Sequence, residues 1–120
     1  MNSGILEHNL VDRNETLYRG ISQFYIKRED EGIYRISSGA YKTVDVSVDL
    51  ASKTTPETSV KSFAALAGLT AACPIDLGYK VVEDALPDNP AHALILGKVT
   101  SGDAKKMANV SHWVVPPLKL

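Results

Sequence analysis

The chain has 120 residues, of which 44% are hydrophobic and 22% are charged, as is typical of one folded domain with a single core. Thirteen basic and fourteen acidic residues give a net charge of −1, which argues against an overall field that attracts nucleic acid or an anionic membrane. The single cysteine, Cys73, excludes a disulfide within the chain and a zinc–thiolate cluster.

The N-terminal residues 1–16 show little hydrophobic periodicity, so we expect an N-terminal arm there. One globular domain is expected over 17–115 and a C-terminal tail over 116–120. Residues 1–9 lack the basic start and the apolar run of a signal peptide. No segment approaches the roughly 20 apolar residues that cross a membrane. We therefore expect a cytoplasmic protein that makes no membrane contact.

The first half of the domain predicts strands. Apolar and β-branched residues favour strands at Leu17–Ile21, continuing into Phe24–Ile26, and at Ile33–Ile36. The polar run at 27–32 predicts a loop. The clearest strand is Val44–Leu50, because its apolar and polar residues alternate. We interpret its apolar face as buried and its acidic face as solvated.

Two helices are expected after this strand. Thr55 is a suitable N-cap residue, a proline follows it, and Gly68 offers a left-handed stop, which together predict a helix over Pro56–Ala67. Its apolar residues recur at helical spacing and form one stripe that suits the face of a sheet. Residues 100–103 are typical of the start of a shorter helix, which ends near Val110.

The second half of the chain also predicts strands. Tyr79–Glu83 is strand-like but weakly patterned, whereas Ala91–Val99 is apolar on both faces in its middle and is therefore expected at the centre of the sheet. Strands interrupted by one good helix and one short helix predict an α+β fold, a single domain with a mixed or mainly antiparallel sheet.

A rigid turn precedes the strand at Ala91–Val99. Leu86–Pro90 holds two prolines around Asp88 and Asn89, whose side chains bond readily to local backbone groups, so we expect an ordered turn. His92 follows it. A carboxylate on one imidazole nitrogen, such as that of Asp84, would leave the other nitrogen for base or ligand chemistry. The alternative is a histidine at a strand end that bonds to a backbone carbonyl.

Cys73 has two interpretations. It is either a nucleophile that His92 activates and Asp76 orients, or a packed side chain in an apolar run, since free cysteines are among the most buried residues. The three histidines of the chain are scattered and lack metal-ligand spacing. We therefore expect no metal site and no bound cofactor.

Tyrosine and arginine residues gather in the first half of the chain. They suit a stacking platform for a nucleotide or single-stranded nucleic acid, and equally the hot spots of a protein interface. The neutral total charge argues against nucleic acid, and a nucleotide or NAD stays open as a ligand. The binding residues that we expect are Tyr18, Arg19, Tyr34, Arg35, Tyr41, Asp88, Asn89 and His92.

Four segments carry a resemblance to known proteins: LYRG at 17–20, SSGAY at 37–41, SVDL at 47–50 and DNPAHALI at 88–95. They resemble small bacterial proteins that have no assigned function. This resemblance covers most of the chain and implies no activity.

The chain is also similar to ADP-ribosyltransferase-like folds, including the RES-type toxins that act on NAD. Those folds have an arginine on an early strand, a serine on a following strand and a later acidic or polar catalytic residue. The resemblance implies that Arg19 matches the arginine and Ser47 the serine, with Glu57 or Glu83 as the acid. For an enzyme, the expected catalytic residues are Arg19, Ser47, Glu83 and His92.

No complete cofactor, metal or nucleophile signature occurs in the sequence. Binding is therefore expected before catalysis. The first hypothesis is a small cytoplasmic bacterial binding or accessory module that acts through protein–protein interaction. The alternative is an ADP-ribosyltransferase-like enzyme that acts on NAD.

Overall fold

A computed structural model describes residues 9–118, which form one α+β domain. Six strands make an antiparallel sheet in the order β6-β7-β4-β1-β5-β8, and β2 and β3 pair separately as a hairpin. The strands are β1 (Thr16–Ile21), β2 (Ile26–Asp30), β3 (Ile33–Ile36), β4 (Val44–Leu50), β5 (Ala65–Thr70), β6 (Lys80–Glu83), β7 (His92–Lys98) and β8 (His112–Val115). The helices are α1 (Pro56–Ser59), α2 (Ala72–Asp76) and α3 (Ser101–Val110), with 3-10 turns η2 (Gln23–Tyr25), η3 (Ser38–Ala40) and η4 (Ala51–Lys53).

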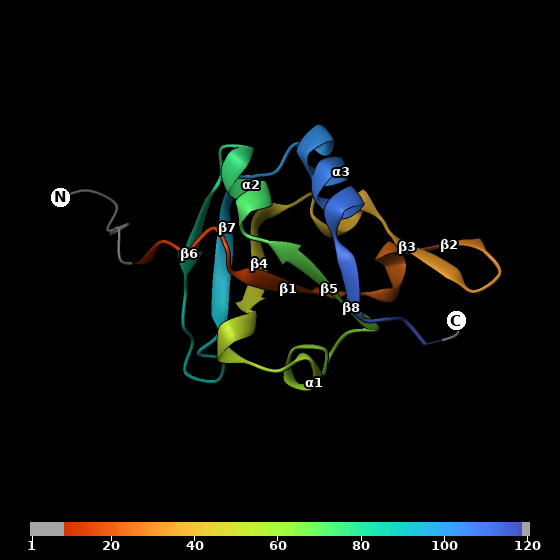
Figure 1. Cartoon of the computed structure of the whole chain (residues 1–120), viewed down its shortest axis with the longest axis horizontal. Coiled ribbons are helices and arrows are strands. Elements are labelled where there is room, and N and C mark those ends of the chain that lie inside the picture. The colour runs from red at the N-terminus through yellow and green to blue at the C-terminus, as the bar shows by residue number, and fades with distance from the viewer. Residues whose placement is uncertain (1–8, 119–120) are drawn as a thin grey trace.

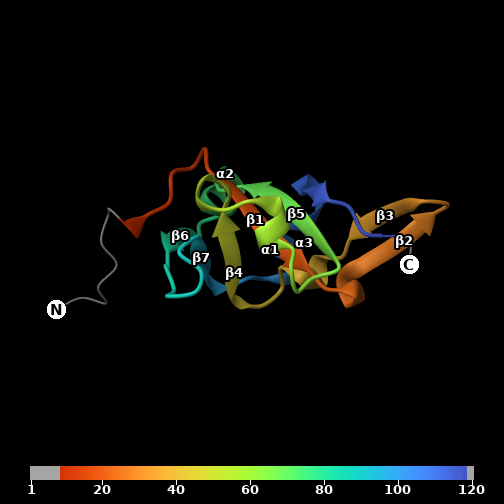
Figure 2. The same ribbon diagram turned by 90° about the horizontal axis from the view of Figure 1, so that it is seen from below.

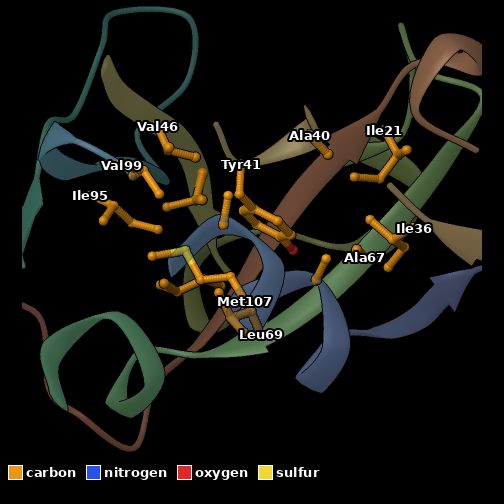
Figure 3. Close-up of a cluster of buried hydrophobic side chains, with 14 of the residues drawn as sticks. Ile21, Ile36, Ala40, Tyr41, Val46, Ala67, Leu69, Ile95, Val99 and Met107 are labelled. Carbon is orange, nitrogen blue, oxygen red and sulfur yellow. The ribbon is translucent and has the colours of Figure 1, made fainter. Parts of the chain in front are cut away.

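The main core lies between one face of the sheet and the helices α2 and α3, which Figure 1 shows above the strands. Tyr41 and Met107 are fully buried at its centre and meet apolar side chains of the strands (Figure 3). Alternation along the strands explains this arrangement, because Val46 and Ile95 point to the core while their neighbours point away.

The opposite face of the sheet is polar. It carries the residues of β1, β4 and β7 that alternate with the core residues, and α1 packs over β1 on this side (Figure 2). The register between β4 and β7 pairs Asp49 with His92 and Ser47 with Leu94. Polar side chains from two neighbouring strands therefore lie together on this face.

Several sequence predictions are confirmed. The fold is α+β with a mainly antiparallel sheet, and Val44–Leu50 is the strand β4, in which Val46, Val48 and Leu50 are buried while Val44 is exposed beyond a register shift. The helix expected from residues 100–103 is α3, capped by Thr100, whose hydroxyl accepts a hydrogen bond from the Asp103 amide. Its buried residues are Ala104, Met107 and Ala108.

The helix predicted over Pro56–Ala67 is wrong. Thr55 does cap a helix, but α1 ends at Ser59 after one turn. Val60, Phe63 and Ala64 lie in the turn that follows, and the chain then enters β5, which lies between β1 and β8 and is buried from Ala65 to Leu69. A short apolar run fits a buried strand and a helix equally well, so helical spacing alone gave the wrong element.

Two further predictions need correction. The polar run at 27–32 is not a loop, because most of it forms β2, held in register by the buried pair Ile26 and Ile36. The turn is confined to the end of the run, where Gly32 has a φ of 72°. The strand at 91–99 is not central, because β7 is one strand from the edge and β1 and β4 occupy the middle.

Part of the predicted N-terminal arm is described. Residues 1–8 lie outside the described range, but residues 9–15 run against the domain. The Val11 side chain is buried and its amide donates to the Val81 carbonyl at 2.8 Å, while Arg13 forms an ion pair with Asp76 at 3.0 Å. Of the predicted tail, residues 119–120 lie outside the described range. No helix within residues 9–118 has the length and apolar character needed to cross a membrane.

Candidate functional site

A cavity of about 250 Å³ opens on the polar face of the sheet. Its floor comes from β1, β4 and the start of β7, one wall comes from α1 and the turn that follows it, and the turn before β7 closes another side. Three of the segments that carry the bacterial resemblance supply lining residues: 17–20, 47–50 and 88–95. The geometry of β1, β4 and β7 thus brings together residues that are far apart in the sequence.

His92 lines this cavity with a fixed imidazole ring. Its Nδ1 lies 2.9 Å from Asp84 Oδ2 and 3.2 Å from the Asp84 carbonyl oxygen. The His92 side chain is only 15% exposed, so the ring has little freedom to turn. Because Nδ1 donates to Asp84, Nε2 is the nitrogen left to accept a hydrogen bond. No described residue bonds to Nε2.

Asp49 stands opposite His92 across the β4–β7 pair. Ser59 Oγ donates to one carboxylate oxygen at 2.7 Å, and Asn89 Nδ2 donates to the other at 2.8 Å. These bonds connect β4 to α1 and to the turn before β7. Asp49 therefore fixes the walls of the cavity and is already hydrogen-bonded at both oxygens.

The turn before β7 is ordered, as its residues suggested. Leu86 and Asn89 exchange two backbone hydrogen bonds of 3.0 Å, and Asn89 Oδ1 accepts from the Ala91 amide at 3.3 Å. Asn89 thus bonds to its own backbone segment with one end of its amide and to Asp49 with the other. Asp88 is exposed at the tip of the turn.

Arg19 also lines the cavity, but its guanidinium group is engaged in holding the backbone. Nε and Nη2 donate to the Ala40 carbonyl at 3.0 and 2.9 Å, and Nη1 donates to the Ser47 carbonyl at 2.9 Å. β1 and β4 pair at only two positions, and the guanidinium fills the opening where they separate. Burial lowers the pKa of Arg19 from its ordinary value, and no described carboxylate pairs with it.

The predicted binding residues lie in three parts of the structure: the cavity, the β2–β3 hairpin and the main core. Tyr18, Arg19, Asn89 and His92 line the cavity, and Asp88 lies beside it. Tyr34 and Arg35 lie on β3 in the hairpin.

Tyr41 lies in the core rather than on a surface. It is fully buried because α3 and η3 enclose it, and burial raises its pKa to about 12. Its hydroxyl lies 2.7 Å from Ser111 Oγ, which itself donates to the Met107 carbonyl, so the tyrosine is the donor of this pair.

The acids expected for an ADP-ribosyltransferase lie away from the cavity lining. Glu83 accepts a hydrogen bond from Lys53 Nζ at 2.6 Å, and Glu57 is exposed on α1. Arg19 and Ser47 do line the same cavity. The acid that accompanies them there is Asp49.

Cys73 and His92 are not brought together. Cys73 belongs to α2 and packs against the main core, whereas His92 lies on the polar face of the sheet. Burial, together with the neighbouring charges of Asp76 and Asp103, raises the pKa of the thiol. A raised thiol pKa disfavours the thiolate that a nucleophile needs.

A second surface lies on the β2–β3 hairpin, which projects from one end of the domain in both ribbon views (Figures 1 and 2). We call the exposed apolar residues Phe24, Tyr25 and Ile33 the hairpin surface. Phe24 is 92% exposed and Ile33 is 54% exposed. Phe24 lies at the base of the hairpin on η2, and Ile33 lies near its tip.

Comparisons with protein-family models, curated proteins and solved structures found no match. Within residues 9–118, no group of three or more histidine, cysteine or acidic side chains is arranged to hold a metal ion.

Part of the cavity lining differs from what the sequence predicted. Asp49 was predicted to be solvated. Its position opposite His92 depends on the pairing of β4 with β7, which are far apart in the sequence, so the sequence did not reveal it. Lys61, Ser62 and Phe63 were assigned to a helix that ends before them. The sequence held no signal for this wall, because Lys61 and Ser62 stand where a helical stripe from Val60 to Phe63 also has polar residues.

Proposed function

We propose that the chain is a small cytoplasmic accessory module that binds a protein partner through the hairpin surface. The observation that carries the proposal is the exposure of Phe24, which is 92% open to solvent. Large aromatic side chains are enriched among the few residues that dominate protein interfaces.

The charges on the hairpin favour a protein partner over nucleic acid. The hairpin carries three basic and three acidic side chains: Lys27, Arg28, Glu29, Asp30, Glu31 and Arg35. A mixed-charge surface provides no stripe of positive potential for a phosphate backbone. It does provide complementary pairs for the rim of a protein interface.

The packing of the hairpin supports the same proposal. Ile26 and Ile36 are buried at its base, and Trp113 Nε1 donates to the Tyr34 carbonyl at 3.0 Å. Beyond these contacts two strands extend from the domain, and an isolated two-stranded ribbon is only marginally stable in water. A partner that covers Ile33 and Phe24 would stabilise it.

Photo-crosslinking tests this proposal. A photoreactive phenylalanine replaces Phe24 in cells of the source organism, and a matched control carries it at Glu57, which is exposed on α1 away from the hairpin. We expect one discrete adduct with a protein from position 24, lost when Ile33→Asp is added. Equal labelling from both positions, or none from position 24, contradicts the proposal. An adduct of twice the chain mass identifies the partner as a second copy.

An NAD-dependent enzyme of the ADP-ribosyltransferase type is the second candidate. The observation in its favour is that Arg19 and Ser47 line one cavity. In this arrangement Asp49, rather than Glu83, is the acid beside them. Incubation of the purified chain with NAD, followed by detection of released nicotinamide, tests it. No release above that of an Asp49→Asn variant rejects it.

A further inference from the structure

The His92 side chain presents one hydrogen-bond acceptor to the cavity. Asp84 orients the ring through Nδ1, so Nε2 accepts while the imidazole is neutral. Asp49, the one acid of the lining, has both carboxylate oxygens bonded within the protein, to Ser59 and Asn89. His92 Nε2 is therefore an acceptor that no described residue occupies and that a ligand hydroxyl group can use.

Several of the remaining polar side chains of the cavity can donate hydrogen bonds. Lys61, Ser62 and Tyr18 line it, and none of the three side chains forms a hydrogen bond or ion pair with another described residue. Two basic residues, Arg19 and Lys61, line the cavity against one acid, Asp49. An ammonium group with several hydroxyl donors suits an anion with three terminal oxygens, since lysine acts as a point charge.

The size and walls of the cavity limit the ligand further. At about 250 Å³ the cavity is smaller than the roughly 300–1,000 Å³ of pockets that enclose drug-sized ligands. The Phe63 ring lies against Gly20, where a Cβ atom would come within 2.2 Å of it, and is 46% exposed. It offers an apolar wall to the carbon chain of a small ligand.

We propose that this cavity binds a small polyol phosphate monoester. Lys61 and the hydroxyl donors face the phosphate group, and His92 Nε2 accepts a hydrogen bond from a ligand hydroxyl. Asp84 is a positioning residue, because it acts by fixing the imidazole. This site goes beyond the hairpin surface and is formed by different elements, so the failure of either proposal leaves the other intact.

Binding is measured by ¹H–¹⁵N NMR titration of the full chain with glycerol 3-phosphate. We expect saturable shifts at the amides of 47–49, 59–63 and 89–92. Inorganic phosphate has only the phosphate group that Lys61 recognises, and glycerol has only the hydroxyl groups that His92 recognises. Each should bind at least about tenfold more weakly than glycerol 3-phosphate, a factor that corresponds to about 1.4 kcal/mol. Absence of these shifts at millimolar probe, or equal binding of inorganic phosphate, overturns the proposal.

Two variants separate the roles of the cavity residues. In His92→Asn, the side-chain amide can still donate to Asp84 but the Nε2 acceptor is gone, so the preference for glycerol 3-phosphate over phosphate should disappear. Lys61→Met should weaken both probes by tenfold or more. Lys61 is exposed, so this variant keeps the fold. Wild-type affinity in either variant overturns the assignment.

Matched controls are available outside the cavity lining: Lys106 lies on α3 over the opposite face of the sheet, and His112 lies on β8, two strands from β1. His112→Asn and Lys106→Met change the same residue types at exposed positions outside the cavity. Both should bind glycerol 3-phosphate as the wild-type chain does. A loss of binding in the controls equal to that in the cavity variants also rejects the proposed site.

Discussion

Arg19 shows how one side chain can hold two strands that do not pair with each other over their whole length. Its guanidinium bonds to the carbonyls of Ala40 and Ser47 and occupies the opening between β1 and β4. Sequence analysis identified Arg19 as a surface or catalytic group, because a lone arginine in a strand says nothing about which carbonyls it will meet. The pairing of His92 with Asp84 was easier to anticipate, since the two residues flank one short turn.

Replacing Arg19 by methionine should destabilise the domain. The part-buried Ala40 carbonyl loses both of its donors, which costs about 1–3 kcal/mol, whereas the exposed Ser47 carbonyl can bond to water instead. Arg19→Lys should recover part of the loss, because one ammonium group cannot match the fork of the guanidinium. Urea unfolding followed by circular dichroism measures both. Wild-type stability in Arg19→Met would show that the carbonyls find other donors.

At the scale of elements, the sheet was easier to predict than the helices. The sequence of β4 alternates between apolar and polar residues, whereas β5 is apolar up to its last residue, Thr70, and lacks the signal of either period. Gly68 illustrates the difference: it was expected to end a helix, but it lies in β5, where the absence of a side chain lets β8 approach. Gly68 pairs with His112 of β8, which is 44 residues later in the chain, so the need for a glycine at this position cannot be seen in the local sequence.

Gly68→Ala should loosen β8. An added Cβ would lie 2.7 Å from the His112 ring and 2.8 Å from Val114 Cγ2, so these two side chains of the edge strand must shift and their packing on β5 is weakened. We expect faster amide hydrogen exchange over β8 and a lower midpoint of thermal unfolding. Gly102→Ala is the matched control, because nothing lies within 4 Å of its added Cβ and alanine favours the helix by up to about 1 kcal/mol. Unchanged exchange in Gly68→Ala would contradict this packing.

For the molecule as a whole, the buried hydroxyl of Tyr41 links stability to alkaline pH. Burial raises its pKa to about 12 in the folded chain, against about 10 when it is exposed. Between these values the unfolded chain loses the proton and the folded chain keeps it. Raising the pH therefore favours unfolding, and the stability conferred below pH 10 is lost as the pH approaches 12.

Tyr41→Phe should remove this part of the pH dependence. The wild-type chain should lose up to about 1.4 kcal/mol more per pH unit than the variant between pH 10 and 12. At neutral pH the variant should be less stable by about 1 kcal/mol, because the bond to Ser111 is lost. Urea unfolding at pH 8, 10 and 11 compares the two chains. Parallel pH profiles would mean that Tyr41 ionises as freely in the folded chain as in the unfolded one.

The strand order also determines what is exposed while the chain is being made. β1 and β5 pair with each other, but β8, which completes the outer edge of β5, lies about 40 residues later in the sequence. At synthesis rates of about 5–20 residues per second, that edge stays open for roughly 2–8 seconds. During this interval the apolar strand Ala65–Thr70 is a template for pairing with another nascent chain. The yield of correctly folded chain in cells will therefore depend on how quickly β8 is synthesised and pairs with β5.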